Sequence, residues 1–230
     1  MSIDIEKIAL EKLYHKNIDL TNFYNYNNFM KNRNGEVKIP EALEKIKDLK
    51  AVIFDVDGVL TNNQVLEIPS GSSPKWRSYY DGQGISLLRA IGIRICFITN
   101  EKDKSANAII SLVKKWNNLP SSTLEDKSLK WKTIDLFVGQ GGVDKARTAT
   151  KWIKSLGLDW KECAVMGDDL VDINMLRLAG LRVAPASAEE LIKDEVDFVS
   201  NRSGGSGAIR DFVNFVLEVR GIDPTKLPFQ

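Results

Sequence analysis

Polar side chains that could do chemistry follow several of the short apolar runs in the sequence. The run AVIF is followed by Asp55 and, two residues on, by Asp57. Side chains at i and i+2 of an extended segment point the same way, so these two carboxylates can approach one phosphate and one cation together. A solvated turn with Gly58 at positive φ would account for one aspartate here but not easily for two.

Three other segments carry complementary groups. Thr99 and Asn100 follow ICFI and offer a hydroxyl and an amide to a phosphoryl oxygen. Lys145 follows GQGGVD at the start of a predicted helix, where free backbone N–H groups favour anions. The segment MGDDLVD (166–172) places three acids around a strand-to-helix turn. Successive acids at a strand end are typical of a site for a hard cation. Alone, the threonine indicates a structural residue and the lysine a surface residue.

The elements that must position these groups alternate along the chain. Apolar runs that predict strands occur at 51–56, 93–99, 134–138, 163–166, 181–184 and 197–200, and helix patterns lie at 85–91, 105–116, 145–156, 170–178, 189–193 and 208–220. This alternation predicts βαβ units and a Rossmann-like α/β fold, with a mainly parallel sheet covered by helices on both faces. Ligands of such sheets bind outside the carboxyl ends of the strands, which is where the chemistry-bearing residues fall.

The chain divides into three expected parts. Residues 1–50 are predicted to be a helical appendage or linker, with helices at 3–14 and 40–49, residues 51–220 the α/β domain, and residues 221–230 a tail. After Thr61, the runs QVLEI and KWRSYY flank the turn-rich PSGSSP, which predicts a β-hairpin over 62–80. This hairpin leaves the end of the first strand and should stand beside the active site. Residues 117–133 are interpreted as a solvated polar loop.

Composition excludes several classes of protein and site. The 230 residues include 32 basic and 31 acidic side chains, and this balance argues against non-specific nucleic-acid binding. The two cysteines cannot form a disulfide framework, and the single histidine, His15, excludes a multi-histidine metal site. No GxxxxGK[ST] segment is present, so the sequence contains no P-loop. A charged N-terminus and the lack of a long apolar stretch predict a cytoplasmic protein with no membrane partner.

Together, these residues resemble the four motifs of the haloacid dehalogenase superfamily over about 51–216, and the DxDGxLT segment with a distant GDD is a specific signature. The resemblance implies that Asp55 is the nucleophile, forming an aspartyl-phosphate. It implies that Asp57 is the general acid and base, and that Thr99 and Lys145 bind the transferring phosphoryl group.

The same resemblance implies a magnesium ion as cofactor. Its ligands would be Asp55, the backbone carbonyl of Asp57, and Asp168, with Asp169 and Asp172 supporting them. A dianionic phosphate repels a carboxylate nucleophile, so attack needs the positive charge that Mg²⁺ and a lysine would supply.

The spacing leaves no room for a full cap domain, because only about 37 residues separate Thr61 from Thr99 and about 45 separate Thr99 from Lys145. YYDGQGISLLRAIGI and SGGSGAIRDF are similar to segments of the capless 3-deoxy-manno-octulosonate 8-phosphate phosphatases. The pattern also resembles phosphatases of nine-carbon sialic-acid-type 9-phosphates and the C-terminal module of acylneuraminate cytidylyltransferases. SGGSGAIR is interpreted either as a helix-capping loop or as part of a subunit interface.

This similarity implies a 2-keto-3-deoxy sugar-acid phosphate as substrate and a homotetramer assembled through the 62–80 hairpins. The substrate is expected to lie against Gly58, Asn100, Asp81 and Gly82. One departure leaves the sugar acid open: the octulosonate enzymes usually have Gly-Arg where this chain has Asn100 and Glu101. Two alternatives remain, a phosphatase of another small phosphomonoester and a non-catalytic oligomerisation module of a sugar-nucleotide synthetase.

Overall fold

The structure is a computed structural model that describes residues 39–67, 74–119 and 131–227. The helix expected at 3–14, the tip of the hairpin and most of the polar loop lie outside the described residues. Within the described part of the chain, parallel strands form one sheet in the order β3-β2-β1-β4-β5-β6. The strands are β1 (Ala51–Phe54), β2 (Arg94–Ile98), β3 (Asp135–Phe137), β4 (Cys163–Met166), β5 (Leu181–Ala184) and β6 (Phe198–Val199). Each of the six strands predicted for the parallel sheet is therefore present, in the α/β fold that the sequence predicts.

Strand β1 lies at the centre of this sheet. All four of its residues are buried, and it pairs with β2 on one side and β4 on the other, with Phe54 opposite Phe97 and Met166. A strand buried on both faces must be apolar throughout, which is why AVIF carries no polar residue until Asp55. Asp55, which follows β1, therefore lies at the middle of the carboxyl edge of the sheet.

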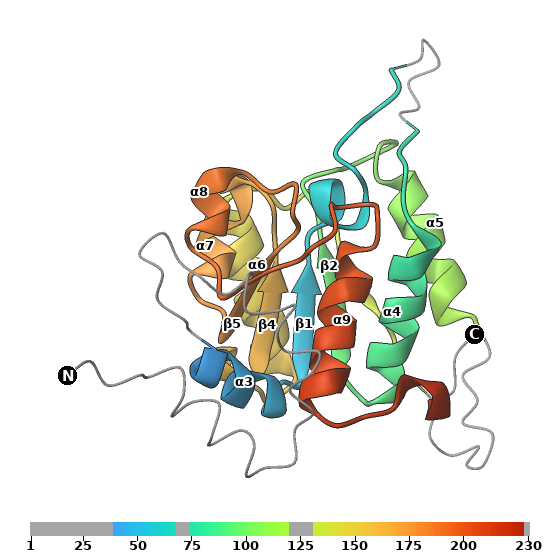
Figure 1. The fold of residues 1–230 in the computed structure, drawn as a ribbon. Coiled ribbons are helices and arrows are strands. Elements are labelled where there is room, and N and C mark those ends of the chain that lie inside the picture. The colour runs from blue at the N-terminus through green and yellow to red at the C-terminus, as the bar shows by residue number, and fades with distance from the viewer. Residues whose placement is uncertain (1–38, 68–73, 120–130, 228–230) are drawn as a thin grey trace.

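Helices cover both faces of the sheet (Figure 1). They are α3 (Ile39–Lys47), α4 (Tyr79–Ala90), α5 (Asn107–Asn117), α6 (Val143–Ser155), α7 (Ile173–Leu176), α8 (Glu190–Lys193) and α9 (Ala208–Val219). The buried residues form two apolar clusters: α3, α4, α5 and α9 contribute to one, and α6, α7 and α8 to the other. Residues Ile53 and Phe54 of β1 alternate between these clusters, as the two faces of a strand require.

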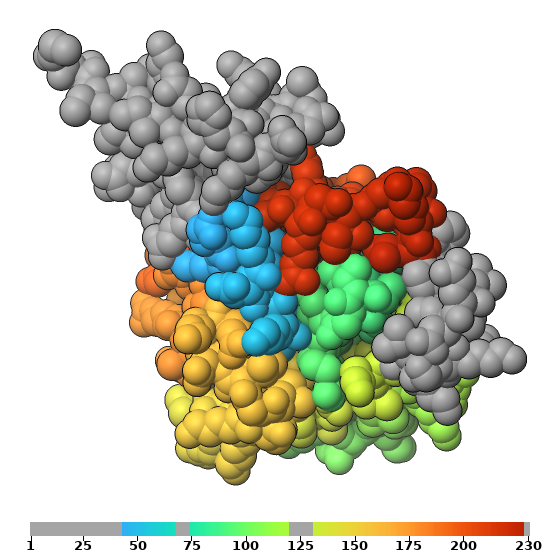
Figure 2. All heavy atoms as spheres, turned by 90° about the horizontal axis from the view of Figure 1, so that it is seen from below, coloured from blue at the N-terminus to red at the C-terminus, as the bar shows by residue number. Residues whose placement is uncertain are grey.

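The last part of the expected appendage is packed on the domain. Leu43, Ile46 and Leu49 are buried in the same cluster as α9, and Figure 2 shows α3, in blue, against α9, in red. The Arg220 guanidinium also donates hydrogen bonds to the carbonyl oxygens of Ile46, Lys47 and Leu49. The packed part of the chain therefore begins before residue 51, because the helix buries its apolar face on α9.

The hairpin differs in part from the expectation. Its arms run antiparallel, with a bridge between Thr61 and Arg77 and a hydrogen bond from Leu66 N to Pro74 O at 3.2 Å, but neither described arm is a regular strand. Tyr79 and Tyr80, expected at the end of the second strand, instead begin α4. The hydroxyl of Ser78 caps that helix by accepting from Tyr80 N. No additional domain stands over the sheet in the described residues.

Candidate active site

The chain turns sharply where β1 ends, and residues 55–60 are called here the catalytic turn. Asp55 is 3% exposed, and its N–H donates to Met166 O on the neighbouring β4 at 3.0 Å. Gly58 has φ +88°, and a Cβ atom on it would overlap the carboxylate of Asp168. Glycine is required at this position for two reasons, the positive φ and the close approach of Asp168.

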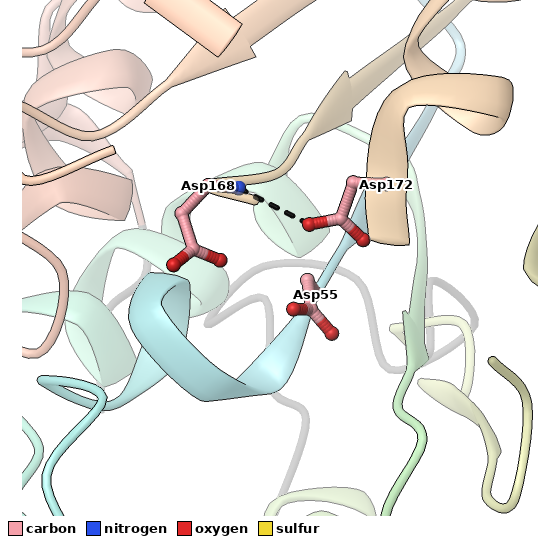
Figure 3. Close-up of side chains that lie close together, drawn as sticks. All are labelled: Asp55, Asp168 and Asp172. Atoms are coloured by element: carbon pink, nitrogen blue, oxygen red, sulfur yellow. Dashed lines mark hydrogen bonds between the residues drawn. The ribbon is translucent and has the colours of Figure 1, made fainter. Parts of the chain in front are cut away.

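Three buried carboxylates meet at this point. One oxygen each from Asp55, Asp168 and Asp172 lies within 4.8 Å of the others, and Figure 3 shows the carboxylate of Asp55 beneath the other two. Asp172 accepts a hydrogen bond from Asp168 N at 3.1 Å. A Cβ on Gly167 would lie 2.5 Å from the Cβ of Asp172, so the loop after β4 passes close to the aspartate that holds it.

Lys145 contributes the charge that opposes these acids. It lies in the first turn of α6, which follows Gly142 at φ +48°, and it is 1% exposed. Its ammonium donates to Asp55 Oδ1 at 2.8 Å and to Asp172 Oδ1 at 2.7 Å. A buried lysine with two carboxylate partners is not the surface residue that its position alone would indicate, because buried charges are found paired.

The electrostatics of the cluster follow from burial and close charges. Burial, and then the charge of Asp172, raise the pKa of Asp55 well above its usual value, against the lowering effect of Lys145. Burial, Asp172 and Asp169 raise the pKa of Asp168 to about 7. Burial alone would lower the pKa of Lys145, but Asp55 and Asp172 raise it above its ordinary value. The cluster therefore has more negative charge than one lysine balances.

The cluster fits a hard divalent cation. Asp168 Oδ1 is buried and has no hydrogen-bond partner among the described residues. A buried, unpaired carboxylate oxygen is costly unless a cation or a donor occupies the space before it. Carboxylate oxygens are the ligands that Mg²⁺ prefers. Asp55 and Asp168 are the side chains that could hold such an ion, with the carbonyl of Asp57 as a further oxygen.

Asp57 faces a lysine that the sequence did not identify. Lys75, on the returning arm of the hairpin, donates to Asp57 Oδ1 and to Glu101 Oε1, both at 2.5 Å, and the Thr61 hydroxyl donates to Asp57 Oδ1 at 3.3 Å. Lys75 and Glu101 are each 14% exposed in their side chains. The spacing of residues in the sequence could not identify Lys75 as a partner of Asp57, because their contact depends on the path of the second arm of the hairpin.

Thr99 and Asn100 lie where the second strand ends. Thr99 is fully buried, and its hydroxyl accepts a hydrogen bond from Glu101 N at 3.0 Å. Asn100 is exposed, and a Cβ on Gly141 would come within 2.7 Å of its Oδ1. The two residues therefore sit at the carboxyl edge beside β1, as predicted, and their contact with a phosphoryl group stays a prediction.

Three of the remaining predicted residues make hydrogen bonds or packing contacts within the protein. Asp81 is fully buried and accepts hydrogen bonds from Gly207 N and Arg210 N, both at 3.1 Å, at the start of α9. Gly82 lies near the side chains of Trp116 and Arg77. Asp169 accepts from Leu170 N at 2.6 Å and begins the short turn that carries Asp172. The carboxylate of Asp81 caps α9, and the contact of Asp81 and Gly82 with substrate stays a prediction.

The arrangement has the parts needed for displacement at phosphorus. A buried carboxylate, Asp55, lies beside an ammonium and a cation-binding cluster, and a second carboxylate, Asp57, lies nearby on the same turn. The first can act as a nucleophile toward an anion only where positive charge is provided, and the second can exchange protons.

The chain is similar to known proteins over most of its length. A sequence profile of the haloacid dehalogenase-like hydrolases matches residues 37–210. The 3-deoxy-D-manno-octulosonate 8-phosphate phosphatase of Salmonella typhimurium is 27% identical over 182 residues, which is 79% of this chain and 86% of that protein. The corresponding enzyme of Escherichia coli K12 is 26% identical over 181 residues, or 79% and 86% of the two chains.

Solved structures share the fold. A HAD superfamily (subfamily III A) hydrolase from Legionella pneumophila superposes with a TM-score of 0.67 and 31% identity, over 80% of this chain and 90% of that one. The 3-deoxy-D-manno-octulosonate 8-phosphate phosphatase of Moraxella catarrhalis, in complex with a magnesium ion, a phosphate ion and a KDO molecule, superposes with a TM-score of 0.63 and 27% identity. That match covers 79% of this chain and 92% of the other.

Proposed function

This chain belongs to the haloacid dehalogenase-like hydrolase family and is a phosphatase, and on that premise we propose that it hydrolyses a 2-keto-3-deoxy sugar-acid phosphate. The proposed substrate is 3-deoxy-D-manno-octulosonate 8-phosphate, on which the Salmonella and Moraxella relatives act by name, or a nine-carbon sialic-acid-type 9-phosphate. The observation that carries the proposal is the buried Asp55, which faces Lys145 within a cluster of carboxylates.

In the proposed reaction, Asp55 attacks phosphorus and forms an O–P bond while the bond to the sugar oxygen breaks. Asp57 gives its proton to that leaving oxygen. Water then attacks the aspartyl-phosphate, Asp57 takes up the proton, and the bond between Asp55 and phosphorus breaks to release phosphate. Lys145 holds Asp55 in place and lowers the cost of bringing two anions together. Thr99 would bind a phosphoryl oxygen with its hydroxyl.

We propose Mg²⁺ as the resident ion, because the Moraxella relative contains magnesium and Asp168 Oδ1 needs a partner. When bound, the ion supplies positive charge that offsets repulsion between the phosphate and Asp55. Asp169 and Asp172 support the site: Asp172 accepts from Lys145 and from Asp168 N, and Asp169 begins the turn that places Asp172.

The test is phosphate release with Mg²⁺ from a panel that contains octulosonate 8-phosphate, nine-carbon ulosonate 9-phosphates and hexose phosphates. We expect preference for one ulosonate phosphate and loss of turnover in Asp55→Asn. The matched control is Asp223→Asn, the same chemical change on an exposed residue of the tail, which should keep full activity. Normal turnover by Asp55→Asn would show that another group is the nucleophile.

A second candidate substrate class is a small phosphomonoester without a carboxylate. The observation that favours it is the Lys75–Glu101 ion pair at 2.5 Å, because Glu101 stands where the octulosonate enzymes usually have an arginine. An acid at this place neutralises a cation that could otherwise bind the substrate carboxylate. Preference for hexose phosphates over all ulosonates in the same panel would favour this candidate. The non-catalytic module is not retained, because the chain is a phosphatase.

We also propose a homotetramer assembled through the hairpin of residues 62–80, in the cytoplasm, where free thiols such as those of the two buried cysteines persist. The described arms expose apolar side chains, with Leu66 62% and Trp76 74% exposed. Figure 1 shows these arms extending beyond the carboxyl edge of the sheet, near the site. Light scattering after size exclusion should give a tetramer for the native chain and smaller species for Leu66→Glu. A native monomer would refute the assembly.

A further inference from the structure

The loop that precedes α9 touches the catalytic turn backbone to backbone. This loop, residues 200–207, is called here the glycine loop. A Cβ atom on its Gly204 would overlap the backbone carbonyl of Gly58. The N–H of Gly205 donates to Val59 O at 3.1 Å. Only a residue without a side chain allows this approach at Gly204, whose φ is not positive, so the requirement there is one of space.

The catalytic turn transmits this contact to the carboxylate cluster. The side of Gly58 that would carry a Cβ faces the carboxylate of Asp168, with no room for a methyl group between them. The backbone of Gly204 therefore packs against Gly58, and Gly58 in turn packs against the carboxylate of Asp168. Close-packed interiors relax only partly, so a shift of the first of these residues moves the next.

The glycine loop is itself anchored from two sides. The carboxylate of Asp81 at the start of α4 accepts from Gly207 N and Arg210 N, both at 3.1 Å. The Ser187 hydroxyl, on the loop after β5, accepts from Gly204 N at 3.0 Å. The loop cannot simply withdraw when its contact with the turn is crowded, because withdrawal would break these hydrogen bonds and leave buried groups unpaired.

We propose that the glycine loop is a positioning element for the reaction and that Gly204 sets the distance between the catalytic turn and Asp168. This positioning role goes beyond helix capping. Its catalytic consequence rests on the proposed function. The loop contributes no side chain to the chemistry; it acts through Gly58. Asp81 acts one step further away, by fixing the end of the loop from which α9 begins.

The experiment compares Gly204→Ala with Gly180→Ala. A Cβ on Gly180 would overlap the carbonyl oxygen of Lys161, next to β5 and away from the catalytic turn, and Gly180 also has no positive φ. Both variants therefore crowd a backbone contact by one methyl group. We expect both to unfold at lower urea concentration. Only Gly204→Ala should lose kcat, by about 10- to 100-fold with KM nearly unchanged, because displaced reacting groups cost rate rather than binding.

A second readout separates this inference from the proposed function. Titration calorimetry with Mg²⁺ alone should show weaker binding to Gly204→Ala than to Gly180→Ala or the native chain, even if no tested substrate is hydrolysed. Equal Mg²⁺ affinity and equal kcat in the two alanine variants would overturn the proposal.

If Gly204→Ala does not fold, Asp81→Asn provides the test, because the amide is nearly isosteric and keeps one acceptor oxygen for the two N–H groups. Loss of positioning predicts a lower kcat at unchanged KM. A raised KM at unchanged kcat would instead make Asp81 a substrate-binding residue and would overturn its place in this proposal.

Discussion

Replacing Lys145 by methionine should remove the ammonium that now offsets the repulsion between the carboxylates of Asp55 and Asp172. The Nζ atom lies 2.8 Å from Asp55 Oδ1 and 2.7 Å from Asp172 Oδ1, and the three side chains are at most 5% exposed. Methionine fills a similar volume without charge, so the packing is kept while the two carboxylates lose their shared donor.

The size of the effect follows from the burial of these groups. Removing one member of a buried ion pair costs about 3–5 kcal/mol, because the remaining charge is left without compensation. Here two acids remain, with oxygens inside the 4.8 Å cluster, and protonation of one of them limits the cost. We therefore expect the free energy of unfolding to fall by about 3–5 kcal/mol in Lys145→Met.

The assay is urea denaturation near pH 7.5 with a chelator present, so that no divalent ion replaces the lost charge. Arg147→Met is the control, because its ion pair with Asp144 lies on the surface of the same helix, with both side chains more than half exposed. Such pairs contribute little, and this variant should unfold almost as the native chain does.

Adding Asp172→Asn to Lys145→Met tests whether repulsion between carboxylates causes the loss of stability. If charge repulsion is responsible, the double variant should be about 2 kcal/mol more stable than the sum of the two single changes predicts. Strictly additive free energies, or a loss no larger than that of Arg147→Met, would refute the reasoning from buried charge.

Three further outcomes are expected. Burial raises the pKa of Asp81 to about 6, so its contribution to stability is fully present below about pH 3.8 and is lost as the pH rises through about 6. Asp81→Asn should therefore gain about 2 kcal/mol relative to the native chain between about pH 4.5 and about pH 7, measured by urea denaturation, and a pH-independent difference would contradict this. Gly58→Ala should lose about 1–3 kcal/mol of stability from its φ of +88° and most of its turnover from the clash with Asp168; an active, stable variant would show that the turn adapts. Mg²⁺ at about 100 times its dissociation constant should stabilise the native chain by about 2.7 kcal/mol, seen as a higher melting temperature, and Asp168→Asn should lose most of that shift, whereas an unchanged shift would place the ion elsewhere.

Strand positions and the order of the chemistry-bearing segments were predictable from the sequence. AVIF, ICFI and CAVM are apolar because β1, β2 and β4 are buried on both faces, and a parallel sheet brings their carboxyl ends together. The convergence of Asp55 with the acids after β4 follows from this topology. The family resemblance is confirmed by the profile that matches residues 37–210.

Features that depend on tertiary contacts were not predictable. Tyr79 and Tyr80 were expected in a strand because aromatic residues favour strands, yet Ser78 caps a helix there and Asp81 follows in its first turn. The contact of Asp81 with substrate stays a prediction, but its hydrogen bond from Gly207 N, 126 residues later in the chain, could not be predicted from local sequence. The pairing of Lys75 with Asp57 likewise depends on the path of the hairpin, which no local pattern specifies.

The contact between α3 and α9 has a consequence for the order of events during synthesis. Leu43, Ile46 and Leu49 leave the ribosome before the helix α9 that covers them. Arg220, which donates to the carbonyl oxygens of Ile46 and Leu49, is made 174 residues after Ile46. Until then these apolar side chains have no native partner on α9, and such exposed surface promotes aggregation. A nascent chain halted before residue 208 should therefore be held by chaperones, and synthesis of α9 should free it.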